Sequence, residues 1–307
     1  LWKLIGFIGA GRVGAQAALE VASQGIDDLV LVDIIDGLAE CEALDISHKI
    51  SETGVDVSVT GSTDFSLLRG SDVVVITAGL ARKPGMTRMD LLGKNSGIVA
   101  SVAKEMAKHC PGATAITVTN PMDVMNYVVI RASGFKKRKV VGMGGLLDLS
   151  RFKYILSKKL GVSRSSINAL VIGEHGENML PLGRYTTVGG VPLTALLNEK
   201  EMAEAIEGTR KIAIEVIAKK GATVDAPGNA IARMVKSVID DRREVLPASA
   251  YLEGEYGVSG VSIGVPLMLG RDGVERIFEL DLDGPEKGAF TKGVTTIREG
   301  IASLPAL

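Results

Sequence analysis

A glycine-rich segment, Gly9-Ala10-Gly11-Arg12-Val13-Gly14, constrains the fold of this chain more than any other part of its sequence. An apolar run at residues 4–8 precedes the segment, and an amphipathic stretch at residues 13–23 follows it. A GxGxxG segment between a strand and a helix is typical of a dinucleotide-binding turn. Its first glycine permits the tight turn, its second lets the backbone approach a pyrophosphate, and its third allows close helix packing. Because a helix N-terminus also carries a partial positive charge, the segment predicts a nucleotide-binding βαβ unit rather than a merely structural turn.

An acidic residue, Asp33, ends the second expected strand nineteen residues beyond Gly14. A carboxylate at this place accepts hydrogen bonds from an adenosine ribose and repels a 2′-phosphate. The next residues, Ile34, Ile35 and Asp36, provide no cation to offset that repulsion. We therefore expect NAD rather than NADP as the cofactor, unless an arginine from elsewhere in the chain reaches the ribose.

The first half of the chain alternates short β-branched runs with longer amphipathic stretches. Strands are predicted at residues 4–8, 29–32, 55–60, 73–77, 115–119 and 140–141. Helices are predicted at residues 13–23, 38–50 and 97–108, where apolar residues recur at spacings of three and four. This alternation is typical of parallel strands joined by crossover helices. It predicts an α/β fold whose first domain, residues 1–143, is a doubly wound parallel (Rossmann) sheet.

The pattern loosens in the second half, residues 144–307. Helices are expected at residues 146–160 and 201–220, and strands at residues 168–172 and 258–268. The segments Gly189-Gly190-Val191-Pro192 and Gly254-Glu255-Tyr256-Gly257 are predicted to be turns between strands. Since no repeat or low-complexity linker separates the halves, we expect a second, α+β domain packed on the first, with a cleft at the junction.

Charge and composition indicate a globular protein without a long-range preference for anionic polymers. The chain has 46% hydrophobic and 23% charged residues, and its 35 basic and 36 acidic residues give a net charge of -1. Such a balance favours neither nucleic acid nor an anionic membrane as a partner. The basic run Lys136-Lys137-Arg138-Lys139 lies between Gly134 and the apolar Val140-Val141, so we interpret it as a solvated turn leading into a strand.

Cysteine usage and the absence of a long apolar run predict a cytoplasmic protein. Cys41 and Cys110 are too few for a disulfide framework and belong to no cluster with metal-site spacing, so neither a disulfide nor a metal site is expected. No apolar stretch approaches the roughly 18 residues of a membrane-spanning helix. The first strand is expected so close to Leu1 that no cleavable leader is expected before it.

Three further motifs follow in the chain: Val118-Thr119-Asn120-Pro121 after a strand, Leu147-Asp148-Leu149-Ser150-Arg151 on a helix, and Ile172-Gly173-Glu174-His175-Gly176 after another strand. With the glycine-rich segment, they make the chain resemble the lactate and malate dehydrogenase family over nearly its whole length. It is most similar to the lactate-dehydrogenase-like branch of the malate dehydrogenases, because Arg82 stands where lactate dehydrogenases carry glutamine. Leu149-Ser150 departs from the usual Ser-Ala, but the spacing of Asp148 and Arg151 is kept.

The resemblance implies a proton relay. His175 would exchange the hydroxyl proton of a hydroxy acid, because an imidazole titrates near neutral pH. Asp148 would hold its other ring nitrogen and stabilise the imidazolium. The remaining histidines, His48 and His109, are interpreted as structural.

The resemblance also implies substrate-binding residues. Arg151 lies three residues from Asp148, hence on the same helix face, and would bind the C1 carboxylate of the substrate through two parallel hydrogen bonds. The alternative for this pair is an ordinary surface ion pair within one helix. Asn120 would anchor the substrate hydroxyl or the nicotinamide side of the site.

Arg82 and Arg88 lie in a segment that also carries Gly79, Pro84 and Gly85, which predicts a mobile loop able to close over the cleft. Arg88 would polarise the carbonyl and stabilise developing oxyanion charge, and Arg82 would bind a second carboxylate. A monoacid would leave Arg82 desolvated and unpaired, which favours malate and oxaloacetate over lactate and pyruvate.

For the cofactor, the resemblance implies contacts from the whole glycine-rich segment and Asp33. It also implies contacts from residues after two further strands and on the following helix: Thr77, Ala78, Gly79, Asn95, Val118 and Asn120. The segment 223–228 is expected to line the nicotinamide pocket, with no role beyond packing assigned to Pro227.

The resemblance therefore implies an NAD-dependent enzyme that interconverts malate and oxaloacetate, a reaction of the tricarboxylic acid cycle. A lactate or other 2-hydroxy-acid dehydrogenase is the alternative enzyme. A non-catalytic dinucleotide-binding sensor is the alternative of another class, although such a protein has no use for His175, Asp148 and three arginines together. The amphipathic stretches 38–50 and 201–220 could pack across a two-fold axis, as homodimer or homotetramer.

Overall fold

The computed structural model describes residues 3–80 and 88–305, with the side chains of residues 88–90 also left undescribed. The proposed substrate residue Arg82 therefore lies outside the described residues, and so does the side chain of Arg88. The expected closing loop, with Pro84 and Gly85, lies outside them as well.

The first half forms a parallel sheet whose strand order is β3-β2-β1-β4-β5-β6. Its elements are β1 (Leu4–Ile8), α1 (Arg12–Ser23), β2 (Asp28–Val32), α2 (Leu38–Thr53), β3 (Val59–Ser62), β4 (Val73–Ile76), α3 (Arg88–His109), β5 (Thr114–Thr117), α4 (Met122–Ser133) and β6 (Val140–Gly142). This order is that of a doubly wound dinucleotide-binding sheet, so the predicted fold class is confirmed. β4 and β5 are buried along their whole length, as expected for strands covered on both faces.

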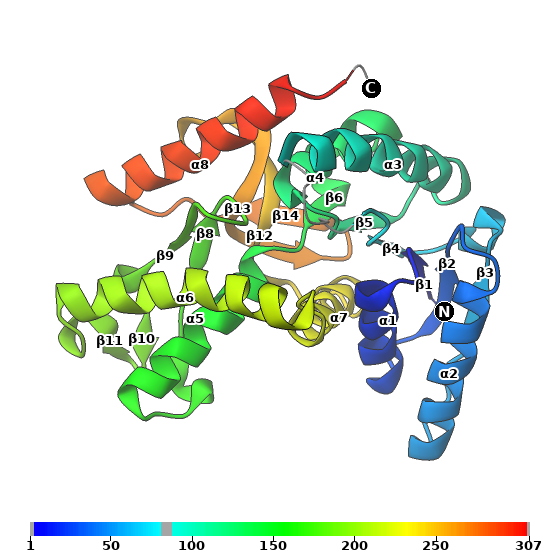
Figure 1. Ribbon diagram of the computed structural model, residues 1–307, viewed down its shortest axis with the longest axis horizontal. Coiled ribbons are helices and arrows are strands. Elements are labelled where there is room, and N and C mark those ends of the chain that lie inside the picture. The colour runs from blue at the N-terminus through cyan, green and yellow to red at the C-terminus, as the bar shows by residue number, and fades with distance from the viewer. Residues whose placement is uncertain (1–2, 81–87, 306–307) are drawn as a thin grey trace.

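Helices cover the two faces of this sheet (Figure 1). α3 and α4 lie on one face, together with α8 (Gly284–Ala302) from the second half. α1 lies on the other face, where it packs against α7 (Asp225–Ile239). The core of the molecule is therefore shared between residues of both halves.

The second half continues the same sheet instead of building a separate one. β12 (Glu244–Glu253) pairs with β6, and β13 (Ser259–Gly270) extends the order through β8 (Val171–Gly173) to β9 (Met179–Pro181). β14 (Gly273–Ile277) pairs with β13, which completes an eleven-stranded sheet in the described part of the chain. All these added pairings are antiparallel.

A smaller lobe lies beside this sheet, at the lower left of Figure 1. It contains α5 (Gly145–Leu160), α6 (Glu199–Lys220) and a three-stranded sheet of β7 (Ile167–Asn168), β10 (Thr187–Val188) and β11 (Val191–Pro192). Phe152, Leu156 and Ile167 form the centre of its own apolar cluster. The glycines of the β10–β11 turn have φ angles of 57° and 86°, which side chains rarely adopt.

Several predicted boundaries were wrong. The strand expected at residues 55–60 lies at Val59–Ser62, because its ladder with β2 begins at Leu29↔Val59. The strand expected at 168–172 is split between β7 and β8, which belong to different sheets. α3 begins nine residues before the predicted helix. The basic run at residues 136–139 leads into β6 through a short 3-10 turn, Lys137–Lys139, as predicted.

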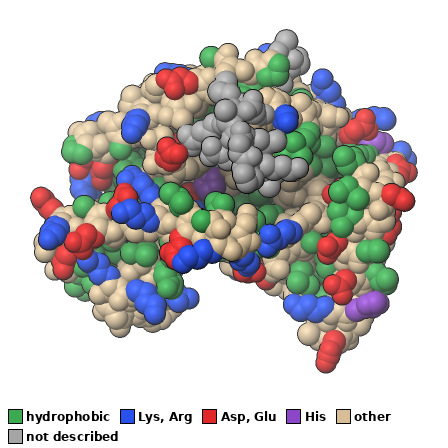
Figure 2. Space-filling model, in the orientation of Figure 1, with side chains coloured by type: hydrophobic (Ala, Val, Ile, Leu, Met, Phe, Trp, Pro, Cys, Tyr) green, Lys and Arg blue, Asp and Glu red, His purple; other side chains and the backbone are tan. Residues whose placement is uncertain are grey.

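Charge is distributed without a single-sign patch on the visible face, where basic and acidic side chains are interspersed (Figure 2). Cys41 is exposed and Cys110 is buried, and both are free thiols. Within residues 3–80 and 88–305, no helix is both long and apolar enough to cross a membrane. The same residues contain no group of three His, Cys, Asp or Glu side chains able to hold a metal ion.

Candidate active site

The glycine-rich segment forms the turn between β1 and α1. Gly9 has a φ of 107°, and a Cβ there would lie 2.6 Å from the backbone nitrogen of Ala78. A Cβ on Gly14 would lie 1.9 Å from the carbonyl oxygen of Gly9, so only glycine lets α1 pack against the turn. A Cβ on Gly11, in contrast, would meet no protein atom within 4 Å. The space in front of Gly11 is thus open for a ligand.

The N-terminus of α1 has no side-chain cap. Gly11 occupies the cap position; in the first turn, Arg12 is exposed and Val13 is half-buried. Uncapped amides at a helix N-terminus, together with the helix dipole, form a ready site for a phosphate group. Ala10, in the same turn, is buried.

Asp33 immediately follows β2 and faces this turn. Its Oδ2 accepts a hydrogen bond of 2.7 Å from the backbone N–H of Ala10, and its Oδ1 accepts one of 3.0 Å from the N–H of Ile35. Each carboxylate oxygen can accept a further bond. The carboxylate is therefore held in a fixed place and can still accept from ribose hydroxyls.

Asn95 in α3 is 1% exposed and ties together two of the loops expected to contact the cofactor. Its Oδ1 accepts from the N–H of Leu80, and its Nδ2 donates to the carbonyl oxygens of Leu80 and Asn120. Thr119 supports the same loop by donating to the carbonyl oxygen of Ala78. The structure thus places Asn95 behind these loops, where it positions them.

The loop after β4 is fixed to the glycine-rich turn. Thr77 Oγ1 donates to the carbonyl oxygen of Gly9 at 2.8 Å, and a Cβ on Gly79 would lie 2.4 Å from Thr119. Val118 and Asn120 follow β5, and Asn120 Oδ1 accepts from the N–H of Met122. These residues therefore follow the carboxyl ends of neighbouring parallel strands, the edge where open α/β sheets bind ligands.

His175 and Asp148 form a hydrogen-bonded pair. His175 follows β8, and its Nδ1 lies 2.7 Å from Oδ2 of Asp148 in the first turn of α5. Asp148 is 1% exposed. A Cβ on Gly144, just before α5, would lie 2.8 Å from the imidazole ring, so the ring is packed directly on this glycine.

Arg151 shares the same carboxylate. Its Nη1 donates to Oδ1 of Asp148 at 2.8 Å, and its side chain is only 12% exposed. The pair is therefore a largely buried one and not the exposed surface pair that was the alternative. Guanidinium groups have five N–H donors, so most of those on Arg151 remain for another anion.

A second carboxylate, that of Asp123, holds the main chain of His175, and it was not predicted from the sequence. Oδ2 of Asp123 accepts from the backbone N–H of His175 at 2.7 Å, and its Oδ1 accepts from Ser249 Oγ at 2.6 Å. On the other side of His175, the carboxylate of Glu174 stabilises the same loop by accepting hydrogen bonds from the backbone N–H and the side-chain NH₂ of Asn178. In the sequence, Asp123 resembles an ordinary acidic residue in the first turn of a helix. The only sequence feature that could have indicated its role is its position two residues after Pro121.

The net effect of these groups is a raised pKa of His175. Burial by itself lowers that pKa, but the charge of Asp148 and its hydrogen bond raise it, as does the charge of Asp123, while Arg151 opposes them. At any given pH, the protonated ring is therefore more populated than in an unperturbed imidazole.

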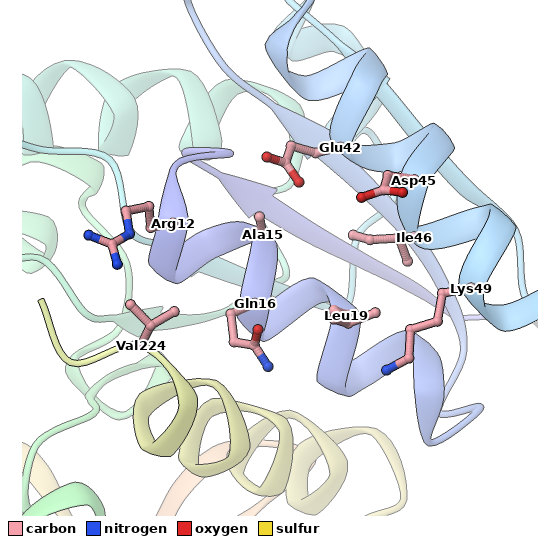
Figure 3. Close-up of a pocket in the computed structure, with 9 residues that line it drawn as sticks. All are labelled: Arg12, Ala15, Gln16, Leu19, Glu42, Asp45, Ile46, Lys49 and Val224. Atoms are coloured by element: carbon pink, nitrogen blue, oxygen red, sulfur yellow. The ribbon is translucent and has the colours of Figure 1, made fainter. Parts of the chain in front are cut away.

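A groove of about 460 Å³ lies elsewhere, between α1, α2 and the start of α7 (Figure 3). Glu42, Asp45 and Lys49 line it from α2, and the guanidinium of Arg12 points away from the two carboxylates. Burial raises the pKa of Glu42, and the neighbouring Asp45 carboxylate raises it further. The groove is lined by Arg12 of the glycine-rich segment and by Val224, but by none of the residues around His175, so it adjoins the expected cofactor site and lies apart from the histidine cluster.

The residues present fit a bound dinucleotide. The open space at Gly11, the uncapped α1 and the fixed carboxylate of Asp33 lie where a pyrophosphate and a ribose require them. Segment 223–228 forms the entry to α7, where Pro227 is buried and a Cβ on Gly228 would lie 2.9 Å from Gln16 of α1.

A Rossmann sheet with this turn and a histidine–aspartate–arginine cluster at its carboxyl edge defines a nicotinamide-dependent oxidoreductase. Two family models match the chain: lactate/malate dehydrogenase, NAD binding domain, over residues 3–142, and lactate/malate dehydrogenase, alpha/beta C-terminal domain, over residues 146–306. The chain belongs to the lactate/malate dehydrogenase family, and NAD is its cofactor.

Individual relatives agree with this assignment. The chain is 46% identical to a malate dehydrogenase of Thermoproteus tenax over 99% of both chains. It resembles the structure of the malate dehydrogenase from Picrophilus torridus in its apo form with a TM-score of 0.95 and 40% identity, covering 98% of this chain and 97% of that one. It also resembles a lactate dehydrogenase from Cryptosporidium parvum, complexed with lactic acid and nicotinamide adenine dinucleotide, with a TM-score of 0.94 and 36% identity over 98% of each chain. The fold alone thus does not separate malate from lactate as substrate.

Proposed function

We propose that this protein is a malate dehydrogenase, which interconverts malate and oxaloacetate with NAD. One observation carries the proposal: a histidine whose ring is held by a buried carboxylate that also binds an arginine, at the carboxyl edge of a dinucleotide-binding sheet. The names of the relatives support malate as the substrate. Bound NAD supplies the hydride-accepting and hydride-donating nicotinamide ring.

His175 moves the proton. Because Nδ1 is bonded to Asp148, Nε2 is the nitrogen left to face the substrate oxygen. In oxidation the neutral ring takes the hydroxyl proton, and in reduction the imidazolium returns it. Asp148 keeps the tautomer and stabilises the charged ring without itself being protonated.

Arg151 binds the carboxylate next to the reacting carbon. Its guanidinium is fixed at one end by Asp148, so its remaining donors are held in one orientation. A planar fork of this kind binds a carboxylate through two parallel hydrogen bonds. Asn120, on the loop that Asn95 supports, is proposed to anchor the substrate hydroxyl.

Arg88 and Arg82 complete the proposed site, and their roles are assigned from the sequence. Arg88 polarises the carbonyl and stabilises developing negative charge. Arg82 binds the second carboxylate, which selects a dicarboxylate, since a monoacid would leave this cation desolvated and unpaired.

We also propose that the protein is a cytoplasmic homodimer or homotetramer that serves the tricarboxylic acid cycle. The two free thiols support a reducing compartment. α2 carries Leu44 with 57% of its surface exposed, and α6 carries Ile214 and Ile217 with 66% and 53% exposed. Such apolar faces on long helices favour packing across a two-fold axis. A domain boundary between residues 143 and 144, just before α5, remains part of the proposal.

Steady-state kinetics with oxaloacetate and pyruvate, each with NADH and NADPH, tests the proposal. We expect kcat/KM for oxaloacetate with NADH to exceed that for pyruvate by about 100-fold or more, because only the diacid pairs every arginine. A preference for pyruvate would establish a lactate dehydrogenase instead. Binding of NADH without turnover of either acid would indicate a dinucleotide-binding sensor.

A further inference from the structure

Asp123 is a buried carboxylate that the proposed mechanism does not use. It lies in the first turn of α4, is 3% exposed, and both of its oxygens accept short hydrogen bonds. The donor at Oδ2 is the backbone N–H of His175, and the donor at Oδ1 is the hydroxyl of Ser249 in β12. Burying a carboxylate is costly unless it is fully hydrogen-bonded, so its presence behind the proton-transferring residue requires an explanation.

These bonds join three segments of the site. Asp123 lies in α4, which begins directly after Asn120-Pro121, and His175 follows β8. Ser249 lies in β12, where it pairs with Gly142 of β6. His175 is therefore held at two points by two carboxylates, its ring by Asp148 and its main chain by Asp123. The hydrogen bond to Asp123 fixes the position of the His175 backbone, and the hydrogen bond to Asp148 fixes the orientation of its imidazole ring.

The charges around the pair determine how each group titrates. Glu174 and His175, both from the loop after β8, are the charged neighbours of Asp123, and β12 contributes only the neutral Ser249. α5 directs Asp148 and Arg151 at His175, and α4 directs Asp123 at it. Burial raises the pKa of Asp123 to about 7, while the bonds from Ser249 and His175 oppose this rise. The Asp123 charge thus changes in the pH range in which the imidazole itself titrates.

We propose that Asp123 is a positioning residue for the proton transfer: it anchors the main chain of His175, and its negative charge favours the imidazolium form. The proposal rests on the proposed role of His175 as the general acid and base. It assigns to Asp123 a contribution to the pH dependence that a purely structural carboxylate would not make.

Asp123→Asn is the main test, because an amide can keep both bonds while it removes the charge. Its oxygen can accept from the His175 N–H and its NH₂ can donate to Ser249 Oγ. We expect a folded protein in which kcat/KM for oxaloacetate is about 10-fold lower at neutral pH, since less of the ring is protonated. The pH midpoints of reduction and oxidation should both move downward.

A direct reading of the His175 pKa separates failure of this proposal from failure of the proposed function. The chain has only 3 histidines, so NMR titration of the ring signals resolves His175 against His48 and His109 as internal controls. Asp123→Asn should lower the pKa of His175 alone, whether or not the protein reduces oxaloacetate. An unchanged His175 pKa in the folded variant would overturn the proposal.

Ser249→Ala provides a second variant should Asp123→Asn not fold. Loss of the Ser249 hydroxyl removes a hydrogen bond that favours the ionised form of Asp123, while the hydrogen bond from the His175 N–H to Asp123 remains. We therefore expect a smaller downward shift of the His175 pKa. Asp72→Asn, at a carboxylate that bonds the N–H of Leu4 far from the site, is the matched control and should leave the His175 pKa unchanged. A His175 pKa that stays at the wild-type value in Ser249→Ala would contradict the proposal.

Discussion

Oδ2 of Asp148 lies 2.7 Å from Nδ1 of His175 while Oδ1 of the same carboxylate binds Nη1 of Arg151 at 2.8 Å. One buried anion thus orients both the group that we expect to move the proton and the group that we expect to bind the substrate. Because Asp148 lies in the first turn of α5 and His175 follows β8, the pair also joins the start of this helix to the end of a strand.

Replacing Asp148 by asparagine should therefore reduce turnover strongly. An amide is a weaker acceptor for Nδ1–H and carries no charge to stabilise the imidazolium, so we expect kcat to fall by about 10³-fold. Steady-state kinetics in both directions would measure this. Glu204→Gln, which breaks the exposed pair between Lys159 and Glu204, serves as the control and should change kcat less than about 2-fold. A variant Asp148→Asn with near-normal kcat would remove His175 from the mechanism.

The raised pKa of His175 predicts opposite pH profiles for the two directions. Reduction requires the imidazolium and should decline as the pH rises through a midpoint above the ordinary histidine value of 6.5. Oxidation requires the neutral ring and should increase through the same midpoint. Plots of kcat/KM against pH in each direction would check this. Profiles that run in parallel would contradict the assignment of His175.

The second and third glycines of the dinucleotide turn, Gly11 and Gly14, should respond differently to substitution by alanine. Gly11→Ala places its Cβ in open space, so the melting temperature should hardly change, while the Kd for NADH should increase about 10-fold because the added methyl occupies ligand space. Gly14→Ala places its Cβ 1.9 Å from the Gly9 oxygen and should destabilise the protein by about 1–3 kcal/mol. Thermal melts and fluorescence titration with NADH measure the two effects.

Gly97→Ala in α3 is the control for both variants, since nothing lies within 4 Å of its Cβ. It should leave NADH binding unchanged and add up to about 1 kcal/mol of stability. A Gly11→Ala variant that binds NADH normally would show that the cofactor does not approach this turn.

The dinucleotide half could be predicted well because its signals are local. β1 was predicted to the residue, and the glycine turn and Asp33 followed from spacing within about 30 residues, the length of one βαβ unit. Elements that depend on distant partners could not be predicted this way. β12 contains Pro247 and three consecutive small residues, Ala248-Ser249-Ala250, and its place in the sheet depends on pairing with β6 through Ser249↔Gly142 as well as with its neighbour β13.

The site shows the same division. Asp148, Arg151 and His175 are recognisable from motifs, and the structure brings them together. Asp123 was missed, because a first-turn helix acid is common and its partners lie 52 and 126 residues away in sequence. Only the folded sheet places Ser249 and His175 beside it.

We expect the choice between malate and lactate to depend on Arg82, and Arg82→Gln tests this. Glutamine removes the cation that we expect to pair with the second carboxylate, so kcat/KM for oxaloacetate should fall by about 10²–10³-fold. The same change should raise kcat/KM for pyruvate, because a monoacid no longer leaves a desolvated cation unpaired. Arg82→Lys is the matched control: it keeps the charge but loses the two-pronged geometry, and should retain a preference for oxaloacetate at reduced kcat/KM. Equal losses on both substrates in Arg82→Gln would show that this arginine supports the site without selecting the diacid, and the substrate assignment would then have to rest on another group.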